Sequence, residues 1–125
     1  MSRLAIETTD RATKFLPGEE IEVIAEWDLD EPAEAVEVRL VWYTRGKGDQ
    51  DVSLVETKRF DFPSQSESRK CQFTLPHAPY SFSGKLISLI WALEVIALPL
   101  DDSKRIDITI APGGEEITLQ QPIQE

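Results

Sequence analysis

The single histidine, His77, is the residue around which any acid–base or nucleophilic site of this chain would be built. Ser81, Ser83 and Cys71 are the hydroxyls and thiol near it in sequence, and a base within hydrogen-bond reach could activate one of them. His77 lies between two prolines, where a turn is expected, and the sequence identifies no group that would orient it. GxSxG, phosphate-loop and CxxC motifs do not occur. We therefore expect a structural histidine and no enzyme.

Acidic residues gather in two expected loops, and oxygen ligands of this kind are those that Ca²⁺ prefers. In an immunoglobulin-type sandwich these loops would lie at the same end, so their carboxylates could converge on one cation. The alternative is a pair of solvated acidic loops, and the spacing does not fit an EF-hand. One histidine and one cysteine do not suffice for a transition-metal site, so no metal is assigned firmly and no cofactor is implied. The candidate cation ligands are Asp28, Asp30, Glu31, Asp101 and Asp102.

Length and charge narrow the class of protein. The 125 residues suffice for one domain with its own core, and the formal net charge of -10 disfavours binding to nucleic acid or anionic lipid. Residues 1–7 lack the apolar core of an export signal, so we expect a cytoplasmic location. Residues 86–100 are apolar but too short for a membrane-spanning helix, and they include Glu94, so we expect no direct membrane insertion. Cys71 has no partner for an intramolecular disulfide and is expected to be a buried apolar filler.

Apolar residues alternate along most of the chain, which indicates strands. The odd positions from Ile87 to Ala97 share one face, as a core strand requires. Trp27, Trp42 and Trp91 have inward parity in strands expected at 21–29, 36–44 and 85–98, and residues 52–62 are typical of a charged edge strand. The pattern predicts an all-β, immunoglobulin-like antiparallel β-sandwich of about seven strands over residues 1–114 and a polar tail over 115–125, in which Ile117 and Leu119 offer extra pairing. A closed barrel is the alternative.

The outward face of the central strands is only partly polar. Val41, Tyr43, Ile90 and Ile96 fall on this face, with Arg39 and Glu94 as a possible cross-strand pair. If these apolar side chains are exposed, they mark a binding or self-association surface. The alternative is that the C-terminal tail or loops cover them.

Several segments resemble a known family when taken in order. The Pro17-Gly18-Glu19 turn and the strand after it resemble the loop and second strand of arrestin-like domains. The later segments resemble their third strand, phenylalanine-rich strand, proline-serine-glycine turn and long aromatic-centred strand. The resemblance implies a non-catalytic protein-binding domain, although arrestins proper have two sandwiches and this chain has one, without a basic cluster for reading phosphate. The matching segments are residues 15–23, 36–46, 73–76, 79–84 and 87–95.

The sequence thus supports two hypotheses about function. The first is a protein-interaction or scaffolding module that acts through a sheet face or an edge strand, with a protein partner of unknown identity or a second copy of itself. The second is a sandwich that binds a small ligand or calcium at its acidic loop end.

Overall fold

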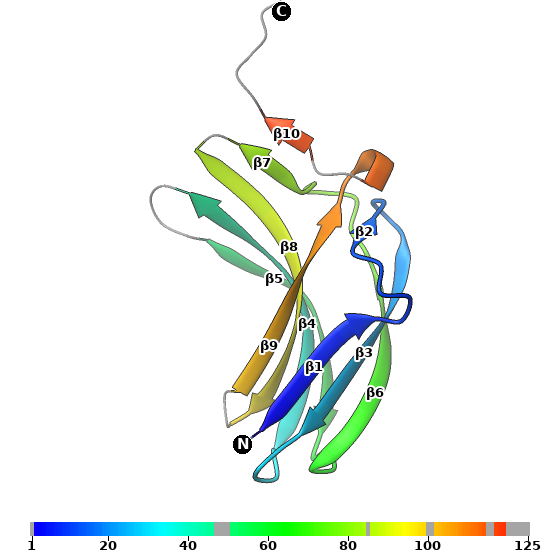
Figure 1. The fold of residues 1–125 in the computed structure, drawn as a ribbon, viewed down its shortest axis with the longest axis vertical. Coiled ribbons are helices and arrows are strands. Elements are labelled where there is room, and N and C mark those ends of the chain that lie inside the picture. The colour runs from blue at the N-terminus through cyan, green and yellow to red at the C-terminus, as the bar shows by residue number, and fades with distance from the viewer. Residues whose placement is uncertain (1, 47–50, 85, 100–101, 115–116, 120–125) are drawn as a thin grey trace, which may run out of the picture.

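The computed structural model describes residues 2–46, 51–84, 86–99, 102–114 and 117–119, which form a nearly all-β fold (Figure 1). This described part contains no helix that could span a membrane. Three short strands and a 3-10 turn are β2 (Lys14–Phe15), β7 (Phe82–Gly84), β10 (Ile117–Leu119) and η1 (Pro112–Gly114). The seven strands of six or more residues are β1 (Arg3–Thr8), β3 (Glu20–Asp28), β4 (Ala35–Gly46), β5 (Val52–Asp61), β6 (Ser66–Thr74), β8 (Ile87–Leu98) and β9 (Asp102–Ile110).

The strands form two sheets. The smaller sheet has the order β1-β3-β6. In the larger sheet β5, β4 and β8 lie side by side, and β7 and β9 share the other edge of β8, with β7 against its first residues and β9 against the rest. The sandwich prediction is confirmed, with seven long strands in two separate sheets, and the barrel alternative is wrong.

Two short pairs depart from the antiparallel pattern. β2 pairs with β9 and β10 pairs with β7 in parallel. Ile117 and Leu119 lie in β10, so the segment predicted as a polar tail contributes a strand to the larger sheet.

The core lies between the sheets, and alternation within the strands builds it. Trp27 and Trp91 are buried, and the half-buried Trp42 packs against the same cluster, as inward parity predicts. Each buried indole also fixes a turn, because Trp91 Nε1 donates to the Pro79 carbonyl at 2.9 Å and Trp27 Nε1 donates to the Ser64 carbonyl at 2.9 Å. A buried tryptophan needs such a partner for its N–H group.

The prediction that Ile87 belongs to the core is wrong. Its side chain is 43% exposed, whereas Leu89, Trp91 and Leu93 on the same face of β8 are buried. Ile87 lies at the start of β8, toward the end of the molecule where the two sheets diverge (Figure 1).

Candidate functional site

The outward face of the larger sheet does not form an exposed apolar strip, so that expectation is wrong. Val41, Tyr43 and Ile96 are buried, and Ile90 is half-buried. Val41, Tyr43 and Ala92 form a second apolar cluster, against which Ile90 packs. We call this group the outer cluster.

The cover of the outer cluster is supplied by side chains of the same face. Tyr43 Oη donates to Asp107 Oδ1 at 3.0 Å, across β8 from its own strand. The Arg105 guanidinium lies 4.4 Å from the centroid of the Tyr43 ring, and that of Arg45 lies 5.7 Å from it. Ala92 stands between Val41 and Asp107 in the register, and its small side chain leaves room for a ring above it. The stems and guanidinium groups of Arg45 and Arg105 therefore cover the Tyr43 ring.

The surroundings of Tyr43 also alter its acidity. Burial and the hydrogen bond to Asp107 raise the pKa of the Tyr43 phenol, and the nearby Arg105 and Arg45 oppose this without reversing it. The phenol is therefore a neutral donor at physiological pH. The sequence contained a signal for this arrangement, since Arg105 and Asp107 alternate with the inward Ile106 and Ile108.

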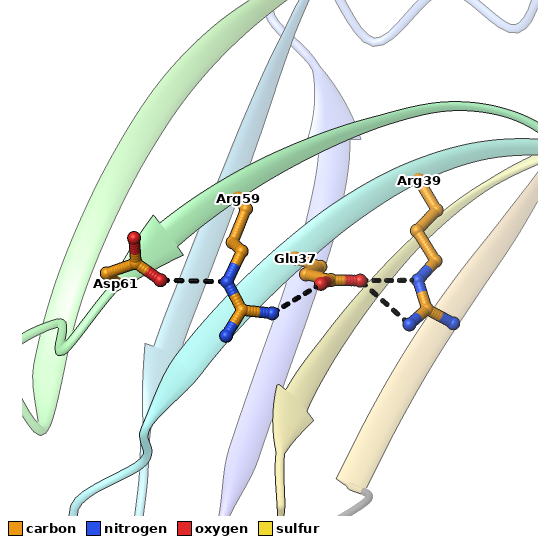
Figure 2. Close-up of polar contacts among 4 residues, drawn as sticks. All are labelled: Glu37, Arg39, Arg59 and Asp61. Carbon is orange, nitrogen blue, oxygen red and sulfur yellow. Dashed lines mark hydrogen bonds and ion pairs between the residues drawn. The ribbon is translucent and has the colours of Figure 1, made fainter.

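Four charged side chains form a ladder beside the outer cluster (Figure 2). Arg39 donates to Glu37 Oε1 through Nε at 2.9 Å and Nη2 at 2.7 Å. Arg59 Nη1 donates to Glu37 Oε2 at 2.8 Å, and its Nε donates to Asp61 Oδ1 at 2.8 Å. The expected partners Arg39 and Glu94 lie directly opposite one another in the register, but the Arg39 guanidinium donates two hydrogen bonds to Glu37. Glu37 is thus the centre of the ladder.

The ladder predicts a pH-dependent contribution to stability. Burial by itself raises the pKa of Glu37, but hydrogen bonds and charges from Arg39 and Arg59 outweigh it, and the pKa is lowered. The stabilisation that ionised Glu37 provides is therefore fully present at pH values above its pKa in the unfolded chain, which is about 4.3. It is lost as the pH falls through the lower pKa that Glu37 has in the folded protein. Glu37→Gln is expected to reduce the free energy of unfolding by about 1–2 kcal/mol at pH 7, and by less at pH 3.5, in urea titrations.

Asp61→Asn is the matched control for this prediction, because Asp61 bonds the same Arg59 but its side chain is 65% exposed. We expect a loss below about 0.5 kcal/mol for this exposed pair. A Glu37→Gln penalty of equal size at pH 3.5 and pH 7 would contradict the assignment.

The acidic loops lie at one end of the sandwich, as expected, since the Glu34 N–H donates to the Leu98 carbonyl at 2.8 Å. No group of three potential metal ligands comes together among the residues that the structure describes, and Asp101 lies outside them. The expectation of converging carboxylates is therefore wrong for the described candidates, and one of them, Asp28, accepts a hydrogen bond from Ser66 Oγ at 2.6 Å. These candidates are Asp28, Asp30, Glu31 and Asp102, all exposed.

His77, Ser81 and Cys71 each lie in a structural contact. The His77 ring packs on Gly18, where an added Cβ would lie 2.5 Å from His77 Cε1. Ser81 is buried, and its Oγ accepts from the Ile110 N–H at 3.0 Å. Cys71 is half-buried and packs against the core, where burial raises the pKa of the thiol to about 11. Little thiolate is present at neutral pH, so the thiol is a poor nucleophile.

The edge strand β5 carries apolar side chains that sequence reasoning did not single out. Val52, Leu54 and Val55 are 65%, 55% and 41% exposed. Leu54 pairs with Val41 and Glu56 pairs with Leu40, so a bulge at Val55 inserts one extra residue. An extra residue reverses the inward–outward parity, which is why the alternation of residues 52–62 is uncertain in the sequence.

Comparisons with known proteins support the fold. The sequence matches no protein-family model and no curated protein. The structure is similar to Spo0M, a sporulation control protein from Bacillus subtilis, with a TM-score of 0.66 and 14% identity over 88% of this chain and 49% of that chain. This likeness confirms the arrestin-like fold, and this chain spans about half the length of Spo0M. A β-glucosidase from Listeria innocua is also similar over 93% of this chain and 16% of that chain, at 13% identity. Its TM-score of 0.46 is too low to support an inference about this chain.

Proposed function

We propose that this chain is a non-catalytic protein-interaction module of the cytoplasm, which binds a partner along the β5 edge of its larger sheet. The observation that carries the proposal is the position of β5 at the end of the strand order, with three exposed apolar residues in its first part. An edge strand offers unpaired backbone donors and acceptors to an incoming strand. Exposed side chains along that strand provide pockets or anchors for alternate residues of the partner.

The distribution of charge along β5 supports the first half of the strand as the part that contacts the partner. Its second half carries Glu56, Lys58, Arg59 and Asp61, of which Lys58 and Glu56 are paired at 2.9 Å. Charged side chains on an edge oppose unselective pairing. Its first half has no charged residue between Val52 and Val55. An apolar partner strand that binds there therefore does not remove a charged side chain from water.

The remaining surface of the same sheet is less suited to apolar contact. Arg45 and Arg105 cover the Tyr43 ring, and the ladder around Glu37 satisfies its own charges. The fold is shared with Spo0M, a sporulation control protein, and this similarity is consistent with a role that involves no catalysis.

Leu54→Glu tests the proposal. The variant is expected to weaken partner binding at least ten-fold, or about 1.4 kcal/mol, because a charge replaces an apolar anchor. Affinity capture from the source organism identifies the partner of the wild-type chain, and titration calorimetry with the purified partner measures the change.

Leu16→Glu is the matched control, because Leu16 is 50% exposed and Leu54 is 55% exposed, but Leu16 lies in the turn after β2. Both variants should fold as the wild type does, as circular dichroism will show. A partner that binds Leu54→Glu with wild-type affinity, or that is lost only with Leu16→Glu, would overturn the proposal.

A further inference from the structure

Hydrogen bonds at the start of β5 show which of its backbone groups face the open edge of the larger sheet. The Thr44 N–H donates to the Asp51 carbonyl at 2.9 Å, and the Asp51 N–H donates to Thr44 Oγ1 at 3.0 Å, so both backbone groups of Asp51 face β4. Successive residues of an antiparallel strand direct these groups to opposite sides. The N–H and C=O groups of Ser53 therefore face β4, and those of Val52 and Leu54 point away from it. Among the described strands β5 pairs only with β4, so the groups of Val52 and Leu54 lie on an open edge.

The side chains of Val52 and Leu54 lie on the outward face of the larger sheet. In the register Val52 is opposite Tyr43 and Leu54 is opposite Val41, and residues directly opposite one another share a face. Val52 and Leu54 are exposed, whereas Tyr43 and Val41 are buried. The outer cluster therefore continues to the edge of the sheet, where a strand added to β5 would extend it.

The bulge at Val55 limits the length of strand that can be added. The register of β5 shifts there, so Glu56 and the residues after it have the opposite inward–outward parity. A strand that matches the faces of Val52 and Leu54 loses this match beyond the bulge. The open segment is therefore the three residues 52–54, which carry no charge.

This segment is complementary to itself in the antiparallel direction. If the two Ser53 residues of two copies meet across a two-fold axis, Val52 of each copy lies opposite Leu54 of the other. Two such pairs, with two bonds each, give four backbone hydrogen bonds, and each pair sets apolar against apolar side chains on the outward face. A shift by two residues toward the second half of β5 would set Val52 against Glu56, which is charged and faces inward. Charge and parity therefore favour the register centred on Ser53.

The arrangement of the two sheets leaves this end of β5 accessible. The sheets pack together at the other end of β5, where the ring centroids of Trp27 and Phe60 are 6.3 Å apart, and they diverge toward the end at which β5 begins (Figure 1). Because the two copies of β5 would run in opposite directions, the smaller sheets of the two molecules would lie at opposite ends of the joined sheet.

We propose that the free chain caps its β5 edge by antiparallel pairing with β5 of a second copy, about a two-fold axis at Ser53, and that a protein partner must displace this copy. The inference rests on the proposed function, because it names what occupies the same edge when the partner is absent. A two-fold contact closes as a dimer. Three residues from each copy bury less than the roughly 1,200 Å² of a standard interface, so the dimer is weak. Each copy carries a net charge of -10, so salt should strengthen the dimer by screening repulsion.

A cysteine at the two-fold axis tests the register. In a Cys71→Ala background, Ser53→Cys is expected to give a covalent dimer on copper-catalysed air oxidation, since residues of a non-hydrogen-bonded pair have Cα atoms about 4.5 Å apart, within reach of a disulfide. Thr57→Cys is the matched control, because Ser53 and Thr57 are both half-buried in β5. In this register the two copies of Thr57 are eight residues apart along the strands, or roughly 26 Å, and should not cross-link. Cross-linking of Thr57→Cys but not of Ser53→Cys overturns the register.

Sedimentation velocity from about 10 µM to 1 mM measures the dimer without any cross-link. Val52→Pro removes an N–H that faces the open edge and makes no bond to β4, so it is expected to raise the dissociation constant at least ten-fold and to leave the fold intact. Circular dichroism checks the fold. Val52→Ile keeps both the N–H and the apolar side chain, and it should dimerise as the wild type does. A wild-type monomer at 1 mM, a dimer weakened by salt, or an unchanged constant for folded Val52→Pro overturns the proposal.

The cross-linked dimer tests displacement. Calorimetry should show that oxidised Ser53→Cys binds the purified partner at least ten-fold more weakly than the same protein after reduction, because its edge is occupied. Equal affinities overturn the displacement. The dimer is measured on the purified chain alone, so its absence together with weaker partner binding by Leu54→Glu overturns this inference and supports the proposed function. A dimer whose partner binds Leu54→Glu with wild-type affinity overturns the proposed function and the displacement, while the self-pairing stands.

Discussion

Replacing Trp91 by alanine is expected to lower the free energy of unfolding by about 3–5 kcal/mol. Domains of this size are stable by about 5–15 kcal/mol, so the change removes a large part of the total and lowers the melting temperature by roughly 10 °C or more. Trp91 is fully buried, lies between Trp42 and Ile108 in the register, and donates to the Pro79 carbonyl. Its removal therefore leaves a cavity and an unpaired acceptor. Urea unfolding followed by circular dichroism measures the loss.

Two variants separate the causes of that loss. Trp91→Phe keeps most of the volume but leaves the Pro79 carbonyl without its donor, at a cost of about 1–3 kcal/mol. Trp42→Ala removes a half-buried indole from the same core and should cost less than Trp91→Ala. Equal losses for Trp42→Ala and Trp91→Ala would contradict the different burial of the two rings.

Replacing Tyr43 by alanine is expected to cost about 3 kcal/mol, although Tyr43 lies on the outward face of the sheet. The ring is 1% exposed, and its loss removes the apolar surface beneath Arg105 together with the hydrogen bond to Asp107. The measurement is the urea midpoint at pH 7, where the phenol is neutral.

Tyr43→Phe separates the ring from its hydroxyl. It keeps the contacts with Arg45 and Arg105 and loses only the bond to Asp107, so a loss of about 1 kcal/mol is expected. A Tyr43→Ala variant as stable as the wild type would show that the outer cluster is not a buried structure in solution.

The sequence predicted the two-sheet sandwich because unbroken alternation determines which residues of a strand face inward. In β3 and β8 no bulge disturbs this pattern, and Trp27 and Trp91 are buried as expected. The same parity placed Val41 and Tyr43 on the outward face correctly, but whether an outward residue is exposed depends on its neighbours in other strands. Tyr43 is buried because the register of β4, β8 and β9 brings Ala92 and Arg105 beside it.

The left-handed conformation of Phe62, which lies between β5 and β6, could not be predicted for a different reason. The bulge at Val55 reverses parity along β5, and the sign of a φ angle is not readable for phenylalanine as it often is for glycine. For the cation hypothesis, the sequence correctly predicted that the two acidic loops lie at the same end of the sandwich. It did not predict that the described carboxylates of these loops fail to converge.

Burial of the larger sheet on both faces affects the order in which the fold opens. β4 places Val38 and Leu40 in the main core and Val41 and Tyr43 in the outer cluster, and β8 is similarly enclosed. Local opening costs least where few buried contacts are broken, and the edge strands β5 and β6 meet that condition. Fraying therefore begins at these edges, and the hydrogen bonds between β4 and β8 are the last to break, so their amides are protected from exchange up to the global free energy of unfolding.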